Sequence, residues 1–148
     1  MVEAFAPGRV ELLGNHTDYN GGLVLAFAVE YGITIRGESR PDRRVVLRSG
    51  SFDGVAETTL DTLQPNREKP WANYLLGVVA QFKKRGFDGP GFEATDTSDL
   101  PAGAGLSSSA ALECAMARFL QKLWGTALTD LELARIGQAA EHEYAGVR

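Results

Sequence analysis

The sequence predicts an α+β fold in which strands come first and helices follow. In the first half of the 148-residue chain, short apolar segments are bounded by turn-forming residues. After residue 70 the apolar residues recur at helical spacing instead. With 44% hydrophobic and 23% charged residues, the chain has enough apolar side chains for a packed core.

Four segments in the first half have the pattern of strands. Each is a short apolar or alternating stretch next to Gly, Pro, Asn or Asp: Gly8–Leu13, Leu23–Val29, Thr34–Ser39 and Val45–Arg48. The Asn20-Gly21-Gly22 run favours a turn before the second of them. A further strand is expected over Gly91–Thr95.

Three helices are expected in the second half. The first has Pro70 near its start and Gly86 after its end, and its apolar face consists of Trp71, Leu75, Val78 and Phe82. The second is predicted from about Ser108 to Trp124, and the third from Leu131 to about Tyr144. A capping box, Thr129-Asp130-Leu131-Glu132, precedes the third helix.

Composition and charge limit the possible partners. Fifteen Lys and Arg against nineteen Asp and Glu give a net charge of −4, which argues against a nucleic-acid or anionic-membrane surface. No segment has the pattern of a signal peptide or the length of a transmembrane helix. The single cysteine, Cys114, cannot form an internal disulfide, and its apolar neighbours predict an inert core thiol. We therefore expect a cytoplasmic protein with no nucleic-acid or membrane partner.

The strongest candidate site is the glycine- and serine-rich segment 100–111, which leads into the second expected helix. Gly103 and Gly105 let backbone N–H groups approach a ligand, and the helix start adds positive potential, so the segment can hold phosphates. Serine hydroxyls can bind phosphate oxygens or Mg²⁺, here those of Ser107, Ser108 and Ser109. It is not a Walker A loop, because no Gly-Lys-Ser/Thr follows at the required spacing. From the residues alone, a glycine turn with a serine helix cap is an equally good interpretation.

A second candidate site lies in residues 6–22, where Arg9 precedes a polar run. Short polar side chains held close together can bind the hydroxyls of a sugar, here Asn15, His16, Thr17 and Asp18. The alternative interpretation is an Asx-type turn that leads into Asn20-Gly21.

Together, the two segments resemble the signature motifs of the GHMP kinases, and segment 6–22 is most similar to the galactokinases within that family. Gly8-Arg9 and Gly14–Tyr19 match the first motif with one exchange, and Gly105–Ala111 matches the end of the second without exception. Weaker matches lie at Trp71–Gly77 and Gln138–Gly146, so the resemblance covers nearly the whole chain.

The resemblance implies a fold and a reaction. The fold would be the α+β N-terminal domain of GHMP kinases, which is shared with the second domain of ribosomal protein S5 and has its helices packed on the sheet. The reaction would transfer the γ-phosphoryl group of ATP to the anomeric hydroxyl of galactose, with Mg²⁺ bound. Residues 1–148 would be cut before the motif that carries the catalytic aspartate, so this base would lie beyond Arg148, and the C-terminal domain would be missing. The fragment alone should then be inactive.

The resemblance also implies roles for single residues. Arg9 would stabilise the transition state, and Asn15, His16, Thr17 and Asp18 would bind the sugar. The phosphates of ATP would be held by Gly103, Ala104, Gly105, Leu106, Ser107, Ser108 and Ser109. The Mg²⁺ ligands would be Ser109 and Glu141. An exposed helix charge is the other interpretation of Glu141, although its small neighbours Ala134 and Gly137 would let another group pack closely over that stripe.

One departure from the family leaves the sugar open. Glu11 and Asn15 have exchanged residue types relative to the galactokinase motif. A kinase for N-acetylgalactosamine or arabinose therefore remains an alternative to a galactokinase. A non-catalytic sugar sensor is a further alternative, because the resemblance also covers galactokinase-like proteins that keep both ligand sites and act as regulators.

Overall fold

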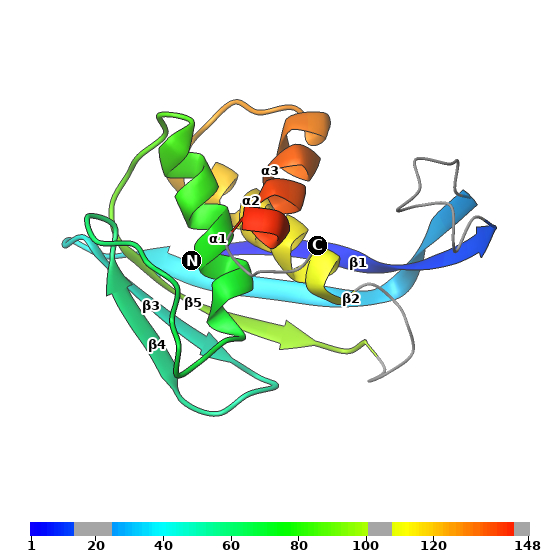
Figure 1. Cartoon of the computed structure of the whole chain (residues 1–148), viewed down its shortest axis with the longest axis horizontal. Coiled ribbons are helices and arrows are strands. Elements are labelled where there is room, and N and C mark those ends of the chain that lie inside the picture. Colours follow the sequence, from blue (N-terminus) through cyan, green and yellow to red (C-terminus); the bar gives the residue numbers. More distant parts are fainter. Residues whose placement is uncertain (14–24, 101–107, 144–148) are drawn as a thin grey trace.

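A five-stranded sheet forms one layer of the molecule, and three helices cover one of its faces (Figure 1). The structure is a computed structural model and describes residues 1–13, 25–100 and 108–143. The predicted α+β fold is confirmed, with β5 (Phe92–Ser98) the one strand that follows a helix.

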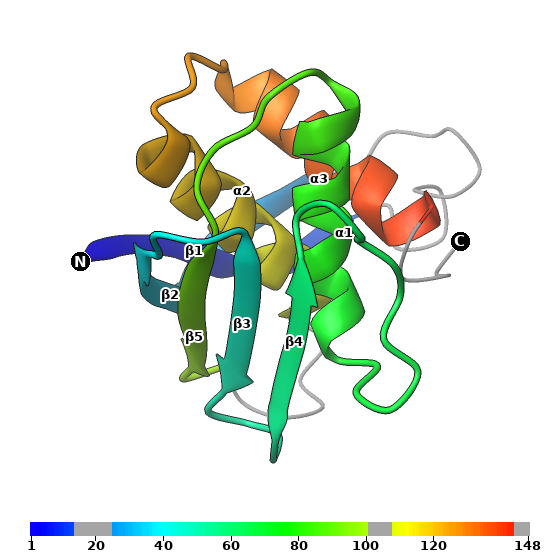
Figure 2. The ribbon, with the colours of Figure 1, turned by 90° about the vertical axis from the view of Figure 1, so that its left-hand side faces the viewer.

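The sheet has the order β1-β2-β5-β3-β4, and β5, β3 and β4 lie toward the viewer in Figure 2. The other bounds are Val2–Leu13 for β1, Leu25–Ser39 for β2, Arg44–Ser49 for β3 and Val55–Thr59 for β4. Neighbouring strands are antiparallel except β3 and β5, which are parallel. This arrangement places β5 between β2 and β3, although β2 and β3 follow one another in the sequence.

Two predictions about strands are wrong. The segments Leu23–Val29 and Thr34–Ser39 belong to one strand, β2, because β1 pairs along it from Gly37 back to Leu25. Strand β4 is not among the predicted strands, since its sequence Val-Ala-Glu-Thr-Thr buries only Ala56 and gives little apolar alternation. β1 and β3 extend their predicted segments, most of all β1, which begins at Val2, whereas β5 begins one residue later than predicted and ends at Ser98.

The three predicted helices are confirmed: α1 (Ala72–Lys84), α2 (Ser108–Trp124) and α3 (Asp130–Glu143). Gly86 follows α1 with a φ of 89°, a left-handed conformation that suits glycine. The predicted capping box starts α3: the backbone N–H of Glu132 donates to Oγ1 of Thr129 over 3.2 Å, and that of Thr129 donates to Oε1 of Glu132 over 3.1 Å.

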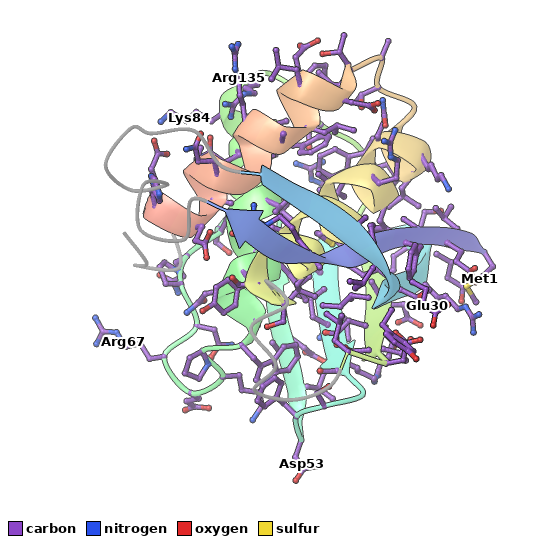
Figure 3. The ribbon with its side chains drawn as sticks, turned by 90° about the vertical axis from the view of Figure 1, so that its right-hand side faces the viewer. Met1, Glu30, Asp53, Arg67, Lys84 and Arg135 are labelled. Atoms are coloured by element: carbon purple, nitrogen blue, oxygen red, sulfur yellow. The ribbon has the colours of Figure 1, made fainter. Side chains whose placement is uncertain are left out.

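Helix α2 is the central element of the core. It packs on β1 and β2, and α1 and α3 pack against it. Phe119 of α2 meets Phe92 of β5 edge to face, with ring centroids 5.7 Å apart, and both side chains are fully buried. On the outer side of the helical layer, Lys84 and Arg135 point into solvent (Figure 3). Among the helices of the described ranges, none is long and apolar enough to cross a membrane.

The predicted core thiol is wrong, because Cys114 is exposed. Although most of α2 is covered, a narrow stripe at i, i+4 and i+8 faces outward or is only partly covered, and Cys114, Arg118 and Lys122 share it. Apolar neighbours in sequence do not bury a helical residue when they lie on other faces of the helix.

Candidate active site

The centre of the candidate site is a hydrogen bond between α2 and α3. Ser109 is the second residue of α2, and its Oγ donates to Oε1 of Glu141 over 2.9 Å. Both residues are partly buried. The structure thus brings together the two residues that the family resemblance implies as Mg²⁺ ligands, and Glu141 is not the exposed helix charge of the alternative interpretation.

The turn between α2 and α3 places Ser109 next to Glu141. Gly125, with a φ of 66°, ends α2, and Nε2 of Gln121 donates to the carbonyl oxygen of Leu128 over 2.8 Å. Arg118 of α2 forms an ion pair with Asp130, the first residue of α3, with the nitrogen and oxygen 2.8 Å apart. The chain is therefore held at the turn, and the two helices run back along each other.

Small residues let the helices approach closely. A Cβ added at Gly137 would lie 3.6 Å from the Cβ of Glu113 and 4.0 Å from the Sγ of Cys114. Gly137 faces Glu113 just as Glu141 faces Ser109, so α2 and α3 are antiparallel here. The expected close packing over the small residues of α3 is confirmed at Gly137, whereas Ala134 is exposed.

Arg9 lies on β1, opposite Ala28 of β2, and it is exposed. Desolvation and Glu113 raise the pKa of the Cys114 thiol, and the positive charge of Arg9 opposes that rise. β1, which carries Arg9, packs against α2, and the charge of Arg9 acts on Cys114, five residues after Ser109 on that helix. β1 and α2 present Arg9 and the Ser109–Glu141 pair on neighbouring elements.

Several predicted site residues lie outside the described residues. These are the proposed sugar-binding run, Asn15, His16, Thr17 and Asp18, and the phosphate-binding residues Gly103, Ala104, Gly105, Leu106 and Ser107. Ser108 is the first residue of α2 and is exposed. The backbone of Glu11 pairs with Ala26 in the sheet. The roles given to all these residues stay predictions.

The predicted position of the catalytic base is likewise untested. Arg148, beyond which the aspartate is expected, lies outside the described residues, which end at Glu143. The described part of the site therefore contains candidate groups for binding phosphate, metal and negative charge, and the origin of the base stays a prediction.

One polar residue of this region, Glu113, is not among the predicted site residues. Its side chain is 1% exposed, and burial together with the carboxylate of Glu141 raises its pKa to about 9. It follows Ser109 by four residues, one helical turn, so helical spacing alone could have placed it on the Ser109 face.

The chemistry of the Ser109–Glu141 pair fits Mg²⁺. Hydroxyl and carboxylate oxygens are ligands that this ion accepts, and it commonly takes only one or two carboxylates and keeps waters and phosphate oxygens. Within the described ranges, no group of three or more His, Cys, Asp or Glu side chains could hold a metal on its own. The pair is suited to an ion that arrives with phosphate and water.

Two family profiles match the chain. The profile of the GHMP kinases N terminal domain matches residues 73–148, which include 103–109 and Glu141. The galactokinase galactose-binding signature matches residues 2–38, which include Arg9 and the run 15–18.

Similar curated proteins are galactokinases. The chain is 41% identical over 149 residues to galactokinase of Staphylococcus saprophyticus, covering 99% of this chain and 39% of that protein. It is 42% identical over 146 residues to galactokinase of Bacillus subtilis, covering 97% of this chain and 37% of that protein. The chain thus spans about two fifths of the length of these relatives.

Solved structures share the fold. Lactococcus lactis galactokinase complexed with galactose superposes with a TM-score of 0.92 at 37% identity, over 99% of this chain and 39% of that chain. A mevalonate kinase superposes with a TM-score of 0.83 at 20% identity, over 99% of this chain and 48% of that chain, a likeness of fold alone. With the α+β fold, the paired Ser109 and Glu141, and a family profile over the second half, the chain belongs to the family of GHMP kinase N-terminal domains.

Proposed function

We propose that this chain is the N-terminal part of an ATP-dependent kinase that phosphorylates galactose at its anomeric hydroxyl. The observation that carries the proposal is the 2.9 Å hydrogen bond between Ser109 and Glu141, which holds two oxygen ligands together at the start of a helix. Support for galactose as the acceptor comes from the galactokinase relatives and from the galactose-binding signature over residues 2–38.

The residues of the pair would hold Mg²⁺. When bound, the ion supplies charge neutralisation on the phosphate oxygens of ATP. The N-terminus of α2 and the backbone of 103–107 would face those phosphates, because helix N-termini favour anions. Phosphoryl transfer needs mainly positioning and stabilisation of charge, and these are the contributions that this region can make.

Arg9 would stabilise negative charge on the attacking oxygen and on the phosphoryl group. Asn15, His16, Thr17 and Asp18 would hold the sugar hydroxyls, with the exchanged pair Glu11 and Asn15 adjusting the sugar preference. The general base would be an aspartate from sequence beyond Arg148. The one cysteine and the mildly acidic composition favour a cytoplasmic enzyme.

A chimera tests the proposal. This chain would replace the matching N-terminal 37% of Bacillus subtilis galactokinase, and galactose 1-phosphate would be measured after addition of ATP and Mg²⁺. We expect turnover with galactose that exceeds turnover with N-acetylgalactosamine and with arabinose. The 148-residue chain alone should give none, because it spans only about two fifths of a relative.

Three results would contradict the proposal. A chimera that unfolds cooperatively and binds galactose but does not phosphorylate it would indicate a sugar sensor. A preference for another sugar would overturn the choice of galactose. A folded chimera that binds no sugar would overturn both the proposed kinase activity and the sugar-sensor alternative.

A further inference from the structure

The strands β1 and β2 continue past the rest of the sheet as a two-stranded ribbon. Within the described residues, β5 pairs with β2 only from Ile33 to Ser39, whereas β1 pairs with β2 as far as Leu25. Figure 1 shows both strands running beyond the ends of the other three. We call residues 9–13 of β1 and 25–28 of β2 the distal ribbon. Because Arg9 is its first residue on β1, the direction of the distal ribbon determines where this guanidinium lies.

A register shift separates the distal ribbon from the rest of the sheet. Pro7 of β1 lies opposite Gly32 and Arg9 lies opposite Ala28, so one residue of β1 faces three residues of β2. Irregularities of this kind bend a strand pair and increase its twist. A two-stranded ribbon has little stability of its own, so its orientation depends on the contacts at its base. Gly32 lies at this base.

Asp99 binds Gly32 through both backbone groups of that residue. The backbone N–H of Gly32 donates to Oδ1 of Asp99 over 2.7 Å, and the backbone N–H of Asp99 donates to the carbonyl oxygen of Gly32 over 3.2 Å. On the neighbouring strand, the ring of Phe5 occupies the space of a side chain at Gly32, where an added Cβ would lie 2.6 Å from Cζ. Gly32 is therefore held both by β1 and by the residue that follows β5.

Asp99 is also the residue after which the chain leaves β5 for the predicted phosphate-binding residues. The N–H of Leu100 donates to Oγ of Ser98 over 3.2 Å, and the side chain of Leu100 packs against the core. A carboxylate that accepts from a backbone N–H makes a stronger bond than a neutral acceptor. Asp99 thus joins two parts of the proposed site that are distant in the sequence: the distal ribbon with Arg9, and the chain that leads to α2.

We propose that Asp99 is a positioning residue for Arg9: by accepting the N–H of Gly32 at the base of the distal ribbon, it sets the direction of the ribbon and holds the Arg9 guanidinium toward α2. Helix α2 packs on β1 and β2, whereas Asp99 holds the edge of β2. The use of Arg9 in phosphoryl transfer rests on the proposed function. Its position relative to α2 does not, and the two can be measured separately.

The single cysteine provides a probe of Arg9 that needs neither substrate nor metal. Cys114 of α2 is exposed, and the charge of Arg9 acts on its thiol. Iodoacetate and iodoacetamide both alkylate the thiolate, but only iodoacetate is attracted by a positive charge, so the ratio of the two rates at one pH reports the local potential. We expect Arg9→Ala to lower this ratio about threefold at low salt. Asp99→Ala should lower it about twofold, because the guanidinium is displaced but still present.

Two further variants make the alkylation test specific. Asp99→Asn keeps an oxygen that accepts the Gly32 N–H, so its ratio should not fall below that of the wild type. Loss of a negative charge alone would favour the anionic reagent, so a fall in Asp99→Ala cannot come from the charge. Asp53→Ala is the matched control, because this acidic side chain at the turn between β3 and β4 points into solvent (Figure 3). An unchanged or raised ratio in Asp99→Ala, or an equal fall in Asp99→Asn, would overturn the proposal.

Hydrogen exchange tests the bond in the unaltered chain, so the proposal does not depend on the folding of a variant. The amide of Gly32 should exchange at least about 100-fold more slowly than an unstructured glycine, because its N–H is donated to Asp99. Asp99→Asn should retain most of this protection. Exchange of the Gly32 amide at the unstructured rate would show that the bond is not formed and would overturn the proposal.

A kinetic measurement connects the position of Arg9 to the reaction. In the chimera, Asp99→Ala should lower kcat about tenfold and leave the KM for galactose within about twofold, and Asp99→Asn should retain most of the wild-type kcat. In the Arg9→Ala background, Asp99→Ala should have little further effect, because the guanidinium that it positions is gone. An equal loss in both backgrounds would show that Asp99 does not act through Arg9.

The measurements separate the possible failures. An alkylation ratio that falls in Asp99→Ala, together with a chimera that phosphorylates no sugar, would support the positioning of Arg9 and count against the proposed function. A kcat that falls in Asp99→Ala while the alkylation ratio stays constant would overturn the positioning role and leave the proposed function standing.

Discussion

The chain contributes to one polar cluster just before β5 and to another after it. The two clusters differ in whether their charged groups are paired and in contact with solvent. The arginine cluster lies before the strand begins and consists of Arg43, Asp61, Lys83 and Asp88. The α2–α3 seam is reached by the chain after the strand ends and contains Ser109, Glu113 and Glu141.

Every charge of the arginine cluster is paired and in contact with solvent. Arg43 donates to Asp61 over 2.9 Å, to Asp88 over 3.1 Å and to the carbonyl oxygen of Gly89 over 2.8 Å. These contacts join the start of β3 to the loops after β4 and α1. The pKa of Asp88 is lowered to about 2, mainly by its hydrogen bond with Arg43.

The α2–α3 seam differs from the arginine cluster in both pairing and burial. Its buried carboxyl group has an oxygen without a partner among the described residues, and desolvation raises its pKa instead of lowering it. A cluster that stabilises the fold satisfies its polar groups, whereas a seam that is kept ready for a ligand leaves some of them unsatisfied. The comparison predicts that mutations will affect activity at one end of β5 and little but stability at the other.

The largest expected effect is on catalysis. In the chimera, Glu141→Ala should lower kcat by on the order of 100-fold, because an oxygen ligand of the expected Mg²⁺ is lost. Arg43→Ala should leave kcat within about twofold, since no proposed substrate contact involves it. Glu38→Ala, at an exposed glutamate of β2, is the matched control for loss of an acidic side chain. Equal losses in the Glu141 and Arg43 variants would break the comparison between the two clusters.

The pH dependence of stability should have opposite signs at the two ends. Below its ordinary pKa of 4.5, Glu113 is protonated in both the folded and the unfolded chain. Between pH 4.5 and about 9 the unfolded chain is ionised while the folded one keeps its proton, so stability falls as the pH rises. The slope from this group is at most about 1.4 kcal/mol per pH unit.

Glu113→Gln should flatten this slope, as measured by urea unfolding at several pH values. Asp88 acts in another window, because its lowered pKa contributes stability that is present above its ordinary pKa and is lost as the pH falls toward 2. Its contribution should be unchanged in the Glu113 variant. A wild-type slope between pH 5 and 8 that survives Glu113→Gln intact would show that other groups, such as Asp96 with its raised pKa, produce it.

A smaller effect is expected from the arginine cluster itself. Arg43→Ala should lower Tm by no more than roughly 3 °C, because exposed ion pairs contribute little and the side chain of Arg43 is 38% exposed. The difference from the wild type should shrink in 1 M salt, where screening weakens the pairs. A large loss that salt does not reduce would point to the hydrogen bond with Gly89 as the main contribution.

The sequence predicts the helices better than the strands, for a physical reason. Helical periodicity and caps are local, so the bounds of α2 and the capping box at Thr129 follow from neighbouring residues. Strand pairing is not local: the length of β2 depends on its pairing with β1, and the burial of Ala56 depends on the rest of the sheet. These features cannot be obtained from short windows of sequence.

The same distinction between local and long-range features applies to the candidate site. The motif around Ser109 is contiguous in the sequence and is recognised there. Glu113 is buried where Gly137 of α3 packs against it, and the exposure of Cys114 depends on which faces of α2 the other elements cover. Contacts between elements distant in the sequence decide both, and only the folded structure contains them.

The smallest expected effect tests how tightly the seam is packed. Gly137 lies inside α3, where glycine is less favourable than alanine by roughly 0.5–1 kcal/mol. The added Cβ would lie 3.6 Å from the Cβ of Glu113 and 4.0 Å from the Sγ of Cys114, both ordinary van der Waals contacts. Gly137→Ala should therefore raise the free energy of unfolding by about 0.5 kcal/mol and leave unchanged the Mg²⁺ concentration that gives the chimera its half-maximal rate. Gly86→Ala is the contrasting control, because its φ of 89° is strained for alanine and the protein should lose stability there. If Gly137→Ala instead raised the Mg²⁺ concentration needed for half-maximal rate while stabilising the fold, the spacing of α2 and α3 would itself set the position of Glu141.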